Sequence, residues 1–121
     1  MTTLAIPVFH QRIAPAFDSC HHVLLIDIEH DHDVERSELQ FSGLWPSERV
    51  AALRGAGANT LICAAISSTL DYMLENAGIR VIAGIAGQID EVLQAFLSNR
   101  LDEPQFFMPG RLRAPTIGKG A

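Results

Sequence analysis

The second half of the chain alternates short uncharged apolar runs with segments in which apolar residues recur at helical spacing. Residues 60–65 carry no charge, as expected of a strand that is buried on both faces. Apolar residues then follow at every third or fourth position, which predicts a helix with Ser67 or Ser68 as its N-cap. A second apolar run at 79–83 and a second helical stripe at 89–97 repeat this order. The succession predicts two parallel strands joined through a helix.

The first half of the chain predicts three strands and one helix. Residues 3–9, 22–28 and 34–41 are rich in apolar and β-branched side chains, and residues 10–19 read as a loop. The polar segment 29–33 is short, so it predicts an antiparallel hairpin. Pro46 stands where a first helical residue is often found, and glycines at 55 and 57 end that helix.

The order of these elements indicates the fold class. Three strands followed by helix, strand, helix, strand and helix is the order of the ribonuclease H-like fold, an α/β architecture with three layers. We therefore expect a mixed five-stranded sheet, in which a hairpin of three antiparallel strands is extended by two parallel strands, with helices on both faces. Residues 1–108 are predicted to form a single domain, and residues 109–121 a flexible C-terminal tail.

Composition and charge narrow the possible partners. The chain has 121 residues, of which 48% are hydrophobic and 19% charged, enough for one domain with a core. A net charge of -5 with scattered basic residues argues against nucleic-acid binding. Cys20 and Cys63 are far apart and form no CxxC pair, so free thiols are expected. With no signal peptide or membrane span visible, the sequence predicts a cytoplasmic protein that does not contact membranes.

The chemistry of ribonuclease H is not expected here. Two-metal catalysis requires carboxylates that hold two Mg²⁺ ions about 4 Å apart, one of them in the first strand. Neither residues 4–9 nor residues 60–65 contain an acidic side chain. No acid–base pair or activated nucleophile is grouped elsewhere in the sequence, so no catalytic residue is predicted and the chain is expected not to be an enzyme.

Several motifs, in order, resemble the dinitrogenase iron-molybdenum cofactor biosynthesis family, which includes NifX-like domains and the C-terminal type domain of NifB. The similar segments are residues 4–8, 12–18, 23–27, 61–66, 74–81, 87–95 and 107–110. The resemblance implies a ribonuclease H-like domain that transiently binds or carries an iron-sulfur or iron-molybdenum cluster precursor without catalysis. It also implies a cluster donor or acceptor protein as a partner, with the chain a monomer or a homodimer.

The sequence departs from the family pattern at two positions. The family has a His-Phe-Gly motif, whose histidine is the usual cluster contact, where this chain has Ala16-Phe17-Asp18. Related chains often have a cysteine after Met-Pro-Gly, where this chain has Arg111. Both changes remove a ligand, so a second interpretation stays open, in which a regulatory or protein-interaction module has kept the scaffold and lost the cluster site.

Candidate ligands gather where the strands of the predicted sheet end. In open α/β sheets ligands favour the crevice beyond the carboxyl ends of parallel strands, and residues 84–87 are expected to close it. Thiolate and imidazole are the donors that an iron-sulfur species prefers, and helix N-termini attract anions. The predicted cofactor-binding residues are His10, Cys20, His21, Cys63, Ser67 and Ser68, with Cys20 and His21 as metal ligands.

Each candidate also has a purely structural interpretation. Cys63 in a buried strand can be a small core residue, and Cys20 with His21 can simply open a strand. His10 can be a surface loop residue. The segment 29–33 contains two histidines that could share a metal, but a solvated hairpin turn, on the opposite rim, explains them as well. The apolar residues 106–108 are expected to seal the sheet edge, or to make a partner contact if exposed.

Overall fold

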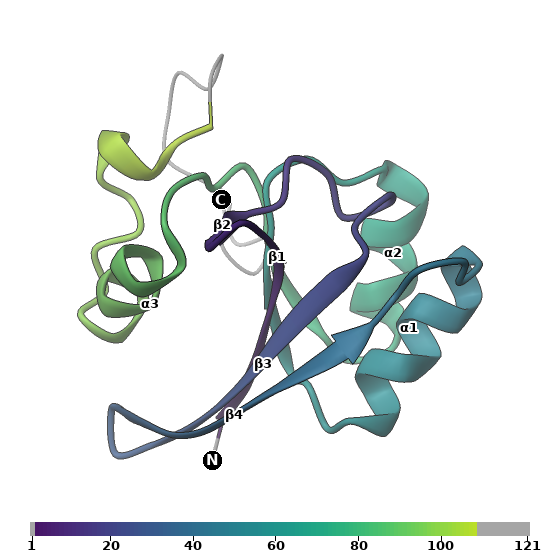
Figure 1. Ribbon diagram of the computed structural model, residues 1–121, viewed down its shortest axis with the longest axis horizontal. Coiled ribbons are helices and arrows are strands. Elements are labelled where there is room, and N and C mark those ends of the chain that lie inside the picture. Colours follow the sequence, from purple (N-terminus) through teal and green to yellow (C-terminus); the bar gives the residue numbers. More distant parts are fainter. Residues whose placement is uncertain (1, 109–121) are drawn as a thin grey trace.

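The computed structural model describes residues 2–108, which form a mixed sheet with helices on both faces (Figure 1). The residues predicted as a flexible tail, 109–121, lie outside the described part, as does Arg111. The elements in chain order are β1 (Thr2–Phe9), β2 (Arg12–Ile13), β3 (His22–Glu29), β4 (His32–Gln40), α1 (Pro46–Gly55), β5 (Thr60–Ile62), α2 (Ser68–Asn76), β6 (Arg80–Ile82), α3 (Ile89–Leu97) and the 3₁₀ turn η1 (Pro104–Phe106).

The sheet has the order β4-β3-β1-β5-β6, with β1 in the centre. Strand β1 pairs antiparallel with β3, from Thr2 opposite Ile28 to Val8 opposite His22. It pairs parallel with β5, which in turn pairs parallel with β6. Strand β3 also pairs antiparallel with β4, so the predicted antiparallel hairpin and the two parallel strands are confirmed.

The core consists of two apolar clusters, one on each face of the sheet, because side chains alternate between the faces along each strand. One cluster joins the sheet to α1 and α2 through residues such as Val23, Leu25 and Leu74. The other joins it to α3 through residues such as Ile26 and Val92. Figure 1 shows α1 and α2 together on one side of the sheet and α3 on the other.

The sheet has six strands rather than the predicted five, because the predicted loop 10–19 contains β2. This two-residue strand folds back on the end of β1, with Val8 opposite Ile13. A pair of residues is too short to show a periodic pattern, so the sequence did not reveal it. Strand β5 also ends at Ile62, although the apolar run continues to Ala65.

Two-residue turns connect β1 to β2 and β3 to β4, and all four of their residues have positive φ. His10 and Gln11 have φ of 51° and 67° between β1 and β2, and His30 and Asp31 have 53° and 65° between β3 and β4. Positive φ at both central positions is the type I′ geometry that matches the twist of a hairpin. The second turn is exposed and lies at the far end of β3, as predicted for a solvated hairpin turn.

The residues at 106–108 close the α3 side of the sheet, which confirms the predicted clasp. Phe106 is 6% exposed and packs in the cluster around α3. The backbone N–H of Met108 donates to the carbonyl of Gly84 at 3.0 Å, and that of Ala86 donates to the carbonyl of Phe106 at 2.8 Å. Residues 106–108 thus fix the position of residues 84–86, which follow β6.

Candidate functional site

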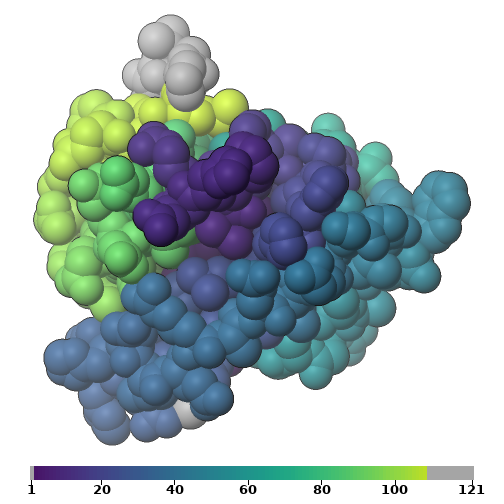
Figure 2. Space-filling model, viewed as in Figure 1, coloured from purple at the N-terminus to yellow at the C-terminus, as the bar shows by residue number. Residues whose placement is uncertain are grey.

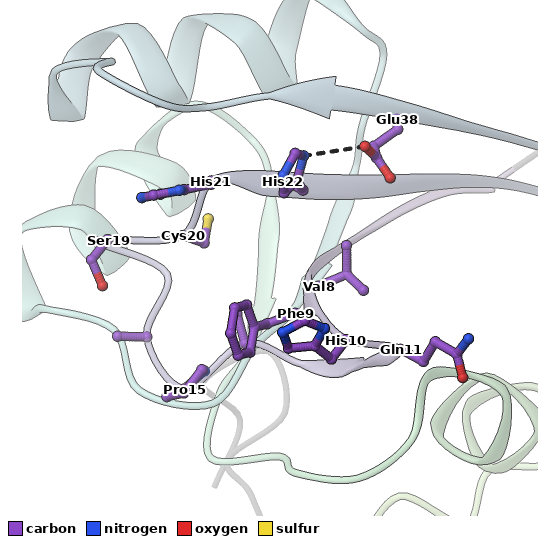
Figure 3. A pocket seen from close by; sticks show the side chains of 12 residues that line it. Val8, Phe9, His10, Gln11, Pro15, Ser19, Cys20, His21, His22 and Glu38 are labelled. Atoms are coloured by element: carbon purple, nitrogen blue, oxygen red, sulfur yellow. Dashed lines mark ion pairs between the residues drawn. The ribbon is translucent and has the colours of Figure 1, made fainter.

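A hollow of about 670 Å³ lies where β1 ends and β3 begins. One wall comes from the end of β1 and its turn, and the other from the segment that enters β3 (Figure 3). In Figure 2 these walls are the purple and violet-blue residues on the face toward the reader. We call this hollow the β1–β3 pocket, and it is lined by Val8, Phe9, His10, Gln11, Ala14, Pro15, Ala16, Ser19, Cys20, His21, His22 and Glu38.

The β1 wall presents an exposed aromatic side chain and an imidazole from a constrained turn. Phe9 is 59% exposed, and its ring centroid lies 4.1 Å from that of His10 in an edge-on arrangement. Left-handed backbone is unfavourable for residues other than glycine, so the surrounding structure must hold His10 and Gln11 there. It does so through the N–H of Ile89, which donates to the carbonyl of Gln11 at 2.9 Å.

Cys20 is the only thiol in the pocket lining, and it is only 5% exposed. Burial raises its pKa to about 11, because the charged thiolate is poorly solvated there. The guanidinium of Arg49 opposes this shift, with Nη1 3.5 Å from Sγ of Cys20. At neutral pH Cys20 is therefore a neutral thiol, and binding a metal through it requires loss of a proton.

The two histidines that follow Cys20 both line the pocket, but only His22 belongs to β3, because the strand begins there and His21 precedes it. Nδ1 of His22 lies 3.2 Å from Oε1 of Glu38, an ion pair when the imidazole is protonated (Figure 3). Their alignment is too poor for a hydrogen bond. His21 is exposed and lies in the pocket lining beside Cys20.

The structure brings three of the six predicted ligands together in the pocket, namely His10, Cys20 and His21. Cys63, Ser67 and Ser68 are not among the lining residues. Cys63 is 0% exposed in the core on the α1–α2 side, and burial raises its pKa further than that of Cys20.

The reason for this separation is that residues 15–18 cover the end of β5. The N–H of Phe17 donates to the carbonyl of Ala65 at 2.9 Å, and the N–H of Ala65 donates to the carbonyl of Pro15 at 3.1 Å. Oδ1 of Asp18 accepts the backbone N–H of Ser67 at 2.9 Å. The start of α2, considered above as an anion site, thus already has a carboxylate from the chain itself.

Residues 84–87, which were expected to close the crevice, contact β2 instead. The carbonyl of Gly87 accepts the N–H of Ile13 at 3.0 Å, and none of these four residues lines the β1–β3 pocket. These residues thus lie beside β2, which pairs with the last residues of β1. His10 and Gln11, by contrast, are among the residues that line the pocket.

Within residues 2–108, no group of three or more histidine, cysteine, aspartate or glutamate side chains is arranged to hold a metal ion. This finding includes the pocket and the hairpin turn with His30 and His32. The β1–β3 pocket therefore offers a few dispersed donors and an apolar wall. It has no preformed metal cage among the described residues.

Sequence reasoning missed two residues that shape the site. Arg49 is 5% exposed and binds the segment that carries Cys20, although arginine on an amphipathic helix is normally at the surface. Asp18 caps a helix 49 residues away in sequence. The sequence held a hint of the buried position of Arg49, because this residue stands next to Val50 and one turn before Leu53, the two residues that face inward from α1. Nothing local indicated the role of Asp18.

The structures that resemble this chain share its fold at low sequence identity. The apo form of the orange protein from Desulfovibrio gigas matches with a TM-score of 0.71 and 17% identity, over 95% of this chain and 96% of that one. A protein from Methanocaldococcus jannaschii, provisionally named a dinitrogenase, matches with a TM-score of 0.70 and 16% identity, over 81% and 89%. A protein from Thermotoga, provisionally named NifB, gives a TM-score of 0.64 and 24% identity, over 92% and 100%.

No curated protein sequence matches the chain. The family model described as "Dinitrogenase iron-molybdenum cofactor" matches residues 2–99, which include every strand and the three α-helices. That match extends over far more than half of the 121 residues. The chain belongs to the dinitrogenase iron-molybdenum cofactor family.

Proposed function

We propose that this protein is a non-catalytic carrier of an iron-sulfur or iron-molybdenum cluster precursor, and that the β1–β3 pocket is where the cluster binds. The family match supports the class of cargo. The observation that supports this pocket as the binding site is that His10, Cys20 and His21 all line it. Cys20 is proposed as the principal ligand, because a thiolate is the donor that iron-sulfur species prefer.

The sparse set of donors fits a cargo better than a resident cofactor. A cluster held entirely by protein usually takes four thiolates or thiolates with imidazoles, whereas the pocket lining has one cysteine and three histidines. A precursor that keeps its own sulfide or other ligands needs fewer protein donors and leaves more readily. The apolar residues Val8, Phe9 and Pro15 would then shield it from water.

Anaerobic reconstitution with iron and sulfide tests this proposal. We expect the wild-type protein to take up iron and to show sulfide-to-iron charge-transfer absorption. Cys20→Ala should lose most of both, because the pocket lining then has no thiol. The matched control is Cys63→Ala, which removes a thiol that does not line the pocket.

Retention of iron by Cys20→Ala, or loss in Cys63→Ala alone, would move the site away from the pocket. A wild-type protein that stays colourless, and that also fails to accept a preformed cluster, would reject the carrier role. Circular dichroism of each variant shows whether the fold is intact, so that loss of iron is not mistaken for unfolding.

A second candidate is a regulatory or interaction module that has lost the cluster site. Ala16 lines the pocket at the position of the family histidine, and its methyl group cannot bind iron. Trp45 and Tyr72 are 73% and 70% exposed on the side formed by α1 and α2, where a protein partner could bury them. This alternative predicts no iron uptake together with a defined complex in light scattering, which Trp45→Ala would weaken.

We further propose that the scaffold is the ribonuclease H-like fold in its three-layer form. The order β4-β3-β1-β5-β6, with β3 antiparallel and β5 parallel to the central strand, supports this assignment. An experimental structure whose strand order differed would overturn it. No helix within residues 2–108 has the length and apolar character needed to cross a membrane.

A further inference from the structure

Arg49, on the inner side of α1, is a buried cation that makes no ion pair with any described residue. Its side chain is 5% exposed. A buried charge without an opposite charge is unfavourable, because the interior solvates it poorly. A buried charge of this kind is tolerated where hydrogen bonds stabilise it or where a bound anion neutralises it.

The contacts of Arg49 are all to neutral groups. Nε donates to the carbonyl of Leu44 at 3.2 Å, and Nη1 donates to the carbonyls of Cys20 and Phe17 at 2.8 and 3.3 Å. The guanidinium also lies over the ring of Phe41, 5.3 Å from its centroid. These contacts fix the segment that carries Cys20 against α1, and they leave the positive charge unneutralised.

This charge lies directly behind the pocket wall. Nη1 is 3.5 Å from Sγ of Cys20, which lines the pocket, whereas Arg49 itself does not. Two acidic side chains also lie in this region. Asp18 accepts the N–H of Ser67, and Glu38 lines the pocket and faces His22. The guanidinium acts on the Cys20 thiol more strongly than the carboxylate of Asp18, which acts in the opposite direction.

We propose that Arg49 is the positioning residue and built-in counter-charge of the β1–β3 pocket, so that the pocket selects a net-anionic ligand at Cys20 over a neutral one of similar shape. The ligand class is a negatively charged metal–sulfur species or another small anion that bonds to or contacts this sulfur. The inference deepens the proposed function, because it concerns the same pocket. It does not depend on whether iron is the metal that binds.

A pair of alkylating reagents tests the charge without any metal. Iodoacetate is an anion and iodoacetamide is neutral, but both react when the thiolate sulfur bonds to the CH₂ carbon and iodide leaves. The rate at Cys20 is measured for each reagent by peptide mass spectrometry at one alkaline pH, with Cys63 as the buried reference. The ratio of the two rates reports the local potential, because both reagents sample the same fraction of thiolate.

We expect Arg49→Met to lower the iodoacetate-to-iodoacetamide ratio about three- to tenfold, the effect of one charge about 6 Å away at an effective dielectric constant of about 40 to 80. Arg49→Lys, which keeps the charge, should restore most of the ratio. Arg54→Met is the matched control, because Arg54 is an exposed arginine on the same helix and does not line the pocket. It changes the net charge equally and should leave the ratio near the wild-type value.

A purely structural role for Arg49 predicts a different result. Loosening of the segment would change both rates by the same factor, and the unchanged ratio would overturn the proposal. An equal fall of the ratio in Arg54→Met would also overturn it, since the effect would then come from net charge. If Arg49→Met does not fold, the native wild-type ratio is compared with that of the same protein unfolded in urea, and a native ratio no higher than the unfolded one counts against the proposal.

A failed proposed function gives a separate signature. If the protein binds no cluster while the alkylation ratio behaves as expected, the pocket is an anion site for another ligand. If the cluster binds through Cys20 but the alkylation ratio does not change in Arg49→Met, the carrier function stands and only the counter-charge role of Arg49 is rejected. The two claims are thus tested by independent measurements.

Discussion

The raised pKa of Cys20 makes the stability of the ligand-free protein depend on pH in the alkaline range. In the unfolded chain the thiol ionises near its ordinary value of 9.0, whereas in the folded protein its pKa is about 11. Above pH 9 the unfolded state therefore loses this proton first. Because the folded state then binds more protons, its stability falls as the pH rises, until the folded thiol also ionises.

The magnitude follows from the difference of about two units. At pH 8 Cys20 contributes almost no penalty, and by pH 10 the loss from this thiol reaches about 1.4 kcal/mol. By pH 11 and above it approaches about 2.7 kcal/mol, the limit set by two units at 1.36 kcal/mol each. Cys63, whose pKa is also raised by burial, adds a similar slope of its own.

The assay is equilibrium urea unfolding at pH 8, 9 and 10 under reducing conditions, followed by far-ultraviolet circular dichroism. We expect the fall in unfolding free energy between pH 8 and pH 10 to be about 1.4 kcal/mol smaller in Cys20→Ala than in the wild type. Other titrating groups are common to both proteins, so they cancel in this comparison. An identical fall in the two proteins would refute the reasoning, because the folded thiol would then titrate like an unfolded one.

Three further perturbations test the architecture around the pocket. Asp18→Ala should destabilise the protein by about 1 kcal/mol in urea unfolding, because the N–H of Ser67 loses its carboxylate acceptor, and a change no larger than that of Ser19→Ala would contradict this. Gln11→Gly and Asp31→Gly should each raise the unfolding free energy by a few tenths to about 1 kcal/mol, because both residues have positive φ; a loss of stability in both would contradict the turn geometry. Gly87→Ala should lower the unfolding free energy more than Gly57→Ala, because a Cβ at Gly87 would lie 3.3 Å from Val92, whereas a Cβ at Gly57 would have no atom within 4 Å. Equal losses of stability would contradict the contact with Val92.

The parts of the fold that the sequence predicted are those with long, regular patterns. The apolar runs of β1 and β3 and the stripe of α3 each extend over eight or nine residues, so periodicity identifies them. Strand β2 has two residues and no pattern of its own. It forms where the His10–Gln11 turn returns the chain beside β1, and the carbonyl of Gly87, far away in the sequence, accepts the N–H of Ile13 in β2.

The candidate site was predicted in part for the same reason. The end of β1 and the start of β3 are neighbours in any antiparallel pairing, so His10, Cys20 and His21 could be grouped from strand order. The end of β5 was expected at the same crevice, and residues 15–18 cover it through backbone hydrogen bonds that leave no mark in residue type. The contact between Arg49 and Cys20 joins positions 29 residues apart and depends on how α1 docks.

The most direct test of the central claim is to map the bound cluster by paramagnetic broadening in amide-resolved NMR, which suits a chain of 13.2 kDa. We predict that loading with an iron-sulfur cluster broadens the amides that line the β1–β3 pocket, centred on Cys20 and His21. Amides of the His30–Asp31 turn, at the opposite end of β3, should remain sharp. Broadening centred on that turn, or spread evenly over the chain, would contradict a cluster site in this pocket.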